Sequence, residues 1–378
     1  MKLLVLSHAC VTPVNQQLFA AVEQKAGWEV DIILPSNWLN DYTSSIKAGR
    51  WPGFSGRLIE VPVLKPGSIP LHVYRKSLSA IIRSSKPDAI YVQHEPYAAA
   101  TYQLYRANAR TLRKPIGFFT WQNIEKRYPI PFRQMERSVL RQSVVAFSGS
   151  ESAEQVLRDK GFSGKTVLLP GSVDPEMYSP QASANALKSE WCDAGTVAIG
   201  YVGRIVEEKG LANLLHALKR IERLPWKLVM VGKGPFEAEF NSLASTLGLS
   251  DRVLQLGYVP HDQIPVYLSA FDMLVVPSET RPNWKEQFGR VIIEAMACGT
   301  PVIGSDSGEI PFLIRATGGG LAFKEGDPAD FAAALETLIS DPNKRSQLAA
   351  TGGDTVRSRY SHDAVVTNFV AAWKDVTR

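Results

Sequence analysis

Cysteine is scarce in this sequence, and it contains neither a long apolar run nor a metal-binding motif. The 378 residues include three cysteines, Cys10, Cys192 and Cys298, which lie far apart. An odd number at such spacings fits neither a disulfide framework nor a set of metal ligands. No stretch approaches the roughly 18 uninterrupted apolar residues of a spanning helix, and the apolar start at residues 1–6 is too short for a signal peptide. We therefore expect a soluble, cytoplasmic protein without a bound metal.

The composition also excludes a disordered chain. Charged residues make up 21% and hydrophobic residues 45% of the sequence, which is typical of a protein with a packed core. A length of 378 residues is too great for one comfortable core, so two domains are expected.

Short apolar runs alternate with segments of helical periodicity along the whole chain. This alternation predicts parallel sheets covered by helices on both faces. The helical segments include residues 71–83 and 151–160. The expected strands are residues 2–7, 29–34, 88–93, 116–120, 144–148 and 166–169, and then 197–203, 227–231, 253–256, 272–276 and 301–303.

The rhythm breaks once, in a segment with two prolines and several small polar residues that is typical of a linker. The sequence therefore predicts two doubly wound α/β domains, at residues 1–175 and 196–360, joined by a linker at 176–195. The last segment, 361–378, is expected to be a helix that packs back on the first domain. Because ligands of parallel sheets bind beyond the carboxyl ends of the strands, the informative residues should follow strands.

The net charge of +5 is unevenly distributed. Residues 1–180 contain 22 Lys and Arg against 14 Asp and Glu, whereas the remainder contains 20 against 23. Arg133, Arg137 and Arg141 recur every four residues and would form one stripe on a helix. The stripe is either a solvated helix face or a contact for an anionic partner, such as phospholipid head groups or a pyrophosphate-linked acceptor. Nucleic acid is a poorer candidate, because no base-stacking aromatics are interleaved with the basic residues.

The segment from Gly203 to Gly210 follows a buried strand. Its flanking glycines allow a tight loop and close approach of the backbone. Arg204 and Lys209, both cationic, suit a diphosphate, since Arg can bind two oxygens at once and Lys is a compact charge. The alternative is a surface loop with ordinary charges.

A second segment contains two glutamates, Glu286 and Glu294, eight residues apart. Residues 289–298 have the apolar density of a buried helix, and Gly289 would let a ligand approach the free N–H groups at its start. A carboxylate at Glu294 inside such a helix needs partners, which are either the two hydroxyls of a ribose or a salt bridge in the core. The segment 232–234 suggests a dinucleotide fingerprint but lacks its third glycine.

Together these segments resemble the retaining, nucleotide-sugar-dependent glycosyltransferases of family 4 (glycosyl transferases group 1), which have the GT-B fold. The resemblance covers most of residues 196–315 and is thinner in the first half, where His94 resembles the family's histidine at a strand end. The loop at residues 8–17 departs from the family, because it lacks the usual Gly-Gly pair. The matching features are Gly203-Arg204 with Lys209-Gly210, the pair Glu286 and Glu294, residues 294–303, residues 308–311, residues 257–260, residues 148–151 and residues 170–174.

The resemblance implies transfer of a sugar from a nucleoside diphosphate to a hydroxyl group, with the anomeric configuration retained. It implies catalytic roles for four residues and contacts with the donor for nine. The catalytic residues would be Arg204, Lys209, Glu286 and His94. The donor would contact Gly203, Arg204, Lys209, Tyr258, Val259, Phe288, Gly289, Arg290 and Glu294.

Within this resemblance, Arg204 and Lys209 would neutralise the leaving diphosphate, Glu294 would hold the ribose, and Glu286 would contact the donor sugar. No metal or cofactor is then required, and the sequence does not distinguish UDP from GDP. The acceptor would be a glycan, glycolipid or lipid-linked hydroxyl, reached by peripheral contact with the inner face of a membrane. The alternatives are a sugar-nucleotide epimerase or hydrolase, a phosphorylase, and a nucleotide-binding module without turnover.

Overall fold

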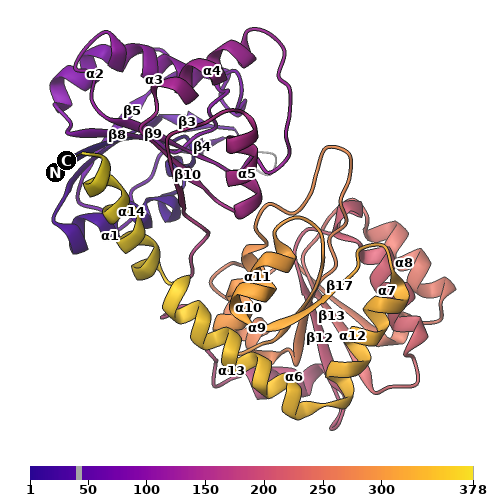
Figure 1. Ribbon diagram of the computed structural model, residues 1–378. Helices are drawn as coiled ribbons and strands as arrows, with labels where there is room; N and C mark the ends of the chain where they lie inside the picture. The colour runs from indigo at the N-terminus through magenta and orange to yellow at the C-terminus, as the bar shows by residue number, and fades with distance from the viewer. Residues whose placement is uncertain (40–44, 378) are drawn as a thin grey trace. The chain divides into compact units, whose positions relative to one another are not determined.

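The computed structural model describes residues 1–39 and 45–377. The chain forms two compact units (Figure 1). Unit 1 comprises Met1–Pro170 together with Val365–Arg378, and unit 2 comprises Gly171–Ala364. Each unit is an α/β layered structure around a parallel sheet.

Unit 1 contains a seven-stranded sheet in the order β11-β10-β9-β8-β1-β2-β5. Every pair of neighbours is parallel. Two short antiparallel pairs, β3 (Asn37–Trp38) with β4 (Ile46–Lys47) and β6 (Val63–Leu64) with β7 (Val73–Tyr74), lie outside this sheet. The strands of the large sheet are β1 (Lys2–Leu6), β2 (Glu29–Pro35), β5 (Arg57–Val61), β8 (Ala89–Val92), β9 (Ile116–Thr120), β10 (Val145–Ser148) and β11 (Lys165–Leu168).

The helices of unit 1 follow the expected alternation, with one difference. Residues 71–83 are not one helix, because Val73–Tyr74 pairs as β7 and Ser77 caps the helix that follows by accepting a hydrogen bond from Ala80 N at 3.2 Å. The helices are α1 (Gln17–Ala26), α2 (Leu78–Ser85), α3 (Ala99–Ala109), α4 (Phe132–Gln142) and α5 (Glu151–Asp159).

The C-terminal helix α14 (His362–Val376) belongs to the core of unit 1. Its side chains Phe369 and Trp373 are fully buried, and both rings pack edge to face against Tyr91 of β8. Burying two large aromatic side chains is worth several kcal/mol, roughly 1.5–3 for each by the usual area estimate. This burial holds a segment from the end of the chain against strands from its beginning.

Unit 2 contains a six-stranded parallel sheet in the order β14-β13-β12-β15-β16-β17. Residues 176–195, expected as a linker, include helix α6 (Ala184–Trp191), which packs against α9 within this unit. The strands are β12 (Val197–Val202), β13 (Trp226–Val231), β14 (Val253–Gly257), β15 (Met273–Val276), β16 (Val302–Ser305) and β17 (Gly320–Phe323). The remaining helices are α7 (Leu211–Arg220), α8 (Glu237–Thr246), α9 (Ile264–Ala270), α10 (Arg290–Ala297), α11 (Ile310–Thr317), α12 (Pro328–Ser340) and α13 (Pro342–Arg359).

Both sheets reverse their strand order next to their first strand, β1 in unit 1 and β12 in unit 2. In open parallel sheets this point leaves a crevice at the carboxyl ends of the strands, where ligands bind. The loops after β12, β15 and β16 are therefore the candidate site of unit 2, and those after β1 and β8 are the candidate site of unit 1.

Candidate functional site

Lys209 and Glu286 form an ion pair at the carboxyl edge of the sheet in unit 2. Lys209 Nζ lies 2.5 Å from Glu286 Oε2, and Ser278 Oγ donates to the same carboxylate oxygen at 3.0 Å. Their side chains are 20% and 12% exposed, so the pair is largely shielded from solvent. Gly210, at φ 65°, follows Lys209, and a Cβ there would lie 1.9 Å from Pro277 O. Glycine is thus required for the close approach that brings the lysine to Glu286.

The backbone around Glu286 is held by the loop after β16. Glu309 N donates to Glu286 O at 3.1 Å, and a Cβ on Gly308, at φ 56°, would lie 2.0 Å from the same oxygen. Ser305 Oγ donates to Ser278 O at 2.5 Å. The loops that follow β15 and β16 are therefore joined into one rigid rim around the carboxylate.

Arg204 follows β12 and remains accessible. Its side chain is 54% exposed, and its guanidinium lies 3.6 Å from Glu208, a contact that solvent weakens. The backbone beside it is tightly packed, since a Cβ on Gly232 would lie 1.8 Å from Gly203 O and one on Gly234 would lie 2.1 Å from Ile205 O. The glycines at 232 and 234 thus serve the contact between two loops.

Glu294 lies on α10 and already has protein partners. Arg290 Nε is 3.1 Å from Glu294 Oε1, and the Tyr178 side chain is also hydrogen-bonded to the carboxyl group. Burial is the main reason that the pKa of Glu294 is raised, and the Arg290 charge opposes this rise. Tyr178 OH lies 3.1 Å from His261 Nε2 as well. No local sequence pattern indicates Tyr178, because both of its partners, His261 and Glu294, lie more than 80 residues further along the chain.

The remaining expected donor contacts differ in exposure. Gly289 caps α10 with φ 75°, and Phe288 before it is buried. Tyr258, after β14, is 74% exposed, and Val259 next to it is half-buried. The structure thus offers an exposed aromatic ring after the edge strand β14 and a glycine-capped helix start after the central strand β15.

In unit 1, His94 does not face solvent. It is 3% exposed, and neither of its ring nitrogens has a hydrogen-bond partner among the described residues. His8 and His72 lie against it, with ring centroids 4.4 Å and 4.9 Å away. Burial, followed by the neighbouring histidines, lowers the pKa of His94 well below its usual value. The family resemblance indicates His94 alone and gives no indication of the two histidines that pack against it.

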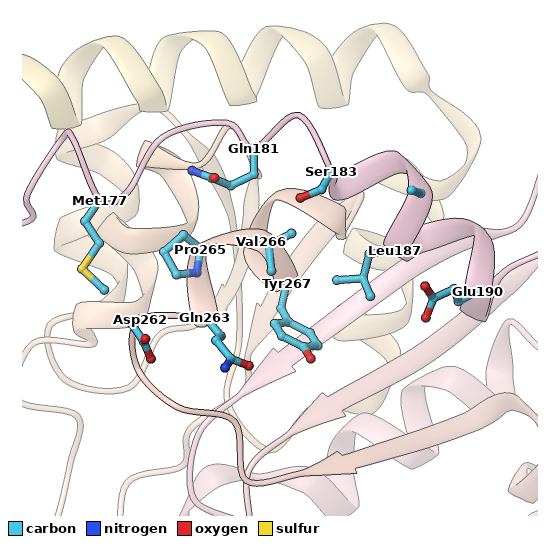
Figure 2. A pocket seen from close by; sticks show the side chains of 11 residues that line it. Met177, Gln181, Ser183, Leu187, Glu190, Asp262, Gln263, Pro265, Val266 and Tyr267 are labelled. Carbon is cyan, nitrogen blue, oxygen red and sulfur yellow. The ribbon is translucent and has the colours of Figure 1, made fainter.

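A cavity of about 550 Å³ lies elsewhere on unit 2, between α6 and α9 (Figure 2). Leu187, Val266 and Tyr267 supply its apolar lining, and Glu190 and Asp262 place carboxylates at it. None of the residues that the sequence assigns to a donor lines this cavity. It is therefore separate from the edge that carries Lys209.

The fold and this edge define a class of protein: two doubly wound α/β units, one of which presents cations and carboxylates beyond its central strands. Residues 192–354 match the family model described as Glycosyl transferases group 1. Residues 192–354 therefore form a domain of this family, and the architecture of the chain is that of the GT-B fold.

Curated relatives of the chain act on different acceptors. It is 30% identical over 252 residues to D-inositol 3-phosphate glycosyltransferase of Stackebrandtia nassauensis, covering 62% of this chain and 56% of the relative. It is 29% identical to a GDP-mannose-dependent phosphatidylinositol monomannoside mannosyltransferase of Mycobacterium tuberculosis, over 61% of this chain and 62% of the relative. The chain spans about half the length of the first relatives that it matches.

Solved structures share the whole architecture. Sucrose-phosphate synthase from Thermosynechococcus elongatus matches with a TM-score of 0.74 at 23% identity, covering 100% of this chain and 99% of that one. HepE of Anabaena in complex with UDP matches with a TM-score of 0.74 at 18% identity, covering 99% and 100%. At these identities the likeness establishes the fold.

Proposed function

We propose that this protein is a retaining glycosyltransferase that transfers a sugar from a nucleoside diphosphate to a hydroxyl group. The observation that carries the proposal is the ion pair of Lys209 and Glu286 beside the start of α10. A cation fixed at a strand end is suited to a leaving diphosphate, and the adjacent carboxylate is suited to sugar hydroxyls. The match of residues 192–354 to the glycosyl transferases group 1 family supports the same reaction.

The proposed reaction breaks the bond between the anomeric carbon and the diphosphate, and forms a bond from that carbon to the acceptor oxygen. Lys209 and Arg204 stabilise the negative charge that develops on the leaving group, which accelerates the step because this charge is greatest in the transition state. The acceptor's proton passes to the departing phosphate oxygen on the same face. Glu294 accepts hydrogen bonds from the ribose once Arg290 turns toward the phosphates.

Donor and acceptor are the finer part of the proposal. Solved structures of HepE contain UDP and UDP-glucose, which makes a uridine nucleotide sugar the first donor to test. Relatives that act on a phosphatidylinositol monomannoside and on lipopolysaccharide core favour a glycolipid or lipid-linked acceptor. We propose that such an acceptor is reached at the inner face of a membrane.

The surface of unit 1 supports contact with anionic lipid. Helices α3 and α4 pack side by side (Figure 1), and α4 exposes the stripe of Arg133, Arg137 and Arg141. Residues 99–114 and 126–142 together contain nine Lys and Arg and one acidic residue, Glu136.

That single acidic residue does not offset the positive charge at the surface. Glu136 is buried and paired with Lys160, its Oε1 lying 2.6 Å from Lys160 Nζ. Ile130, 62% exposed and just before α4, adds an apolar tip of the kind that inserts among head groups. Within residues 1–39 and 45–377, no helix is long and apolar enough to cross a bilayer.

Incubation of the purified protein with UDP-glucose, UDP-galactose and GDP-mannose, with and without acceptor glycans or glycolipids, tests the reaction. Transfer to an acceptor with retention of configuration supports the proposal. Release of free sugar at full rate without acceptor would instead indicate a hydrolase, and conversion to an isomer an epimerase. Formation of a sugar phosphate with inorganic phosphate would indicate a phosphorylase. Binding without any turnover would leave a nucleotide-binding module.

A further inference from the structure

Three histidines of unit 1 form one compact cluster at the carboxyl edge of its sheet. His8 follows β1, His94 follows β8, and His72 lies just before β7. The ring centroids of His8 and His94 are 4.4 Å apart, and those of His72 and His94 are 4.9 Å apart. Because β1 and β8 are neighbours at the point where the strand order reverses, the cluster lies where a parallel sheet binds its ligands.

The ring nitrogens of the cluster differ in access. His72 Nδ1 donates to Ser68 O at 2.9 Å, and its Nε2 is buried without a partner. Both nitrogens of His94 and Nδ1 of His8 are buried without a partner as well. His8 is the partly exposed histidine of the cluster, whereas His72 and His94 are buried, and among the described residues no hydrogen bond is made to His8 Nε2.

The loop that carries His8 is fixed in place by its own hydrogen bonds. Residues 8–17 contain no glycine. Gln16 Nε2 donates to Gly49 O at 2.7 Å, and Ser7 Oγ donates to Gln93 Oε1 at 2.9 Å, which joins the ends of β1 and β8. A backbone without glycine cannot approach a ligand closely, so a side chain must make any contact from this loop.

We propose that His8 is the residue of unit 1 that hydrogen-bonds a hydroxyl group of the substrate, through Nε2, and that His94 and His72 are positioning residues that hold its ring. The hydroxyl belongs either to the transferred sugar or to the acceptor, and this role rests on the proposed function. Half-buried Trp38, whose ring centroid is 4.9 Å from that of His8, adds an apolar wall beside the nitrogen.

The surroundings favour a hydroxyl over a phosphate. Burial, and after it the charge of His72, lowers the pKa of His8 to about 4. Burial is also the main cause that lowers the pKa values of His72 and His94. All three rings are therefore neutral near pH 7. A neutral imidazole nitrogen exchanges hydrogen bonds with an alcohol but offers no positive charge to a phosphate.

Carbethoxylation with diethyl pyrocarbonate, followed by peptide mass spectrometry, tests the placement without needing turnover, because the reagent attacks accessible unprotonated imidazoles. We expect His8 to be modified and His72 and His94 to be spared. Saturating UDP-glucose or acceptor should protect His8 and leave the exposed His216 of α7 unprotected. Modification of His94 ahead of His8, or no protection of His8 by any donor or acceptor, would overturn the proposal.

Substitution tests the role in transfer. His8→Phe keeps a ring in the cluster but removes the nitrogens, and should lower kcat/KM about 10-fold, the scale of one lost hydrogen bond. His8→Gln should recover part of the loss, and His216→Gln is the matched control. Wild-type transfer by His8→Phe, together with a large loss for His94→Gln, would show that His94 itself meets the substrate.

Two further measurements separate the possible results. The first is the rate of donor hydrolysis without acceptor, and the second is the KM for the acceptor. Slower hydrolysis by His8→Phe than by the wild type would place the hydroxyl on the transferred sugar. Unchanged hydrolysis with a raised acceptor KM would place it on the acceptor. If the wild type transfers no sugar from any donor but His8 is still protected by a sugar nucleotide, the proposed reaction fails while the binding role of His8 stands.

Discussion

Lys209 Nζ and Glu286 Oε2 lie 2.5 Å apart, although 77 residues separate them in the chain. The ammonium group is also 5.0 Å from the ring centroid of Trp284. The two opposite charges thus stabilise each other in a largely desolvated environment, where an unpaired carboxylate would lower the stability of the fold. The family resemblance implies separate roles for these two residues, Lys209 at the diphosphate and Glu286 at the donor sugar. Because Lys209 and Glu286 are in contact, a substitution of one also changes the electrostatic environment of the other.

We predict that Lys209→Ala lowers both turnover and stability. Loss of a cation that acts on the leaving group typically costs about 10²–10³ in rate, and the Glu286 carboxylate left behind destabilises the fold by about 1–3 kcal/mol. Urea unfolding and saturating-donor kinetics measure the two effects. The double variant Lys209→Ala/Glu286→Gln should regain stability but not turnover. Recovery of turnover in the double variant would remove Lys209 from the leaving-group role.

Glu286→Ala should discriminate among donor sugars while binding of free nucleoside diphosphate is retained or strengthened, because Lys209 loses its carboxylate partner and stays available to the phosphates. Its carboxylate lies before α10, whereas Glu294 is inside that helix. Isothermal titration with UDP and with UDP-glucose separates the two affinities. A collapse of UDP binding equal to that of a Glu294 variant would contradict the division between sugar and ribose.

We predict that Glu294→Gln weakens binding of a nucleoside diphosphate and that Tyr178→Phe has a smaller effect in the same direction. A carboxylate can accept from both ribose hydroxyls, whereas an amide has one accepting oxygen. Tyr178 would act on the ribose indirectly, through its hydrogen bond to that carboxyl group. A 2′,3′-dideoxy donor should be insensitive to both changes, and equal losses for both donors would argue against a ribose contact.

Vesicle binding should depend on anionic lipid and on the stripe of α4. Each basic residue near an anionic surface contributes about 1 kcal/mol, and salt screens the attraction over roughly 8–10 Å. Arg133→Gln/Arg137→Gln/Arg141→Gln should therefore abolish sedimentation with phosphatidylglycerol vesicles at low salt. The control replaces Lys219, Arg220 and Arg223 of unit 2 by Gln. Equal binding to neutral and anionic vesicles, or no binding by the wild type, would rule out the membrane contact.

The free energy of unfolding should fall when the pH is lowered from about 6.5 to about 4, because the folded protein keeps the buried histidines unprotonated in this range. The pKa of His8 is lowered to about 4 in the folded protein, so the unfolded chain binds a proton that the folded protein excludes. The loss is about 1.4 kcal/mol per pH unit for each such proton. Buried Glu294, whose pKa is raised, opposes this trend. The comparison of wild type with His8→Phe isolates the histidine, and identical pH slopes would contradict its burial.

Much of the fold could be read from local pattern. The expected strands at 116–120 and 227–231 coincide closely with β9 and β13, because a strand buried on both faces is a continuous apolar run. The edge strands β5 and β17 went unnoticed, since most of their residues are only partly buried. In addition, β5 mixes apolar with charged side chains, and β17 is a run of four residues that begins with glycine. The role of Tyr178 and the packing of His8 against His94 were not predicted for another reason. Both depend on contacts between segments that are distant in the sequence.

The sequence by itself predicted the two doubly wound units, the basic stripe and four candidate site residues, Arg204, Lys209, Glu286 and Glu294. These predictions rest on hydrophobic periodicity and on residue spacing within single segments, which reflect the regular geometry of helices and strands. Tertiary structure alone decided which of these groups meet. It paired Lys209 with Glu286, surrounded Glu294 with protein partners, and left His8 partly exposed beside a buried His94. Such pairings depend on the order of strands in the sheet and on the loops packed at its edge, which no local pattern encodes.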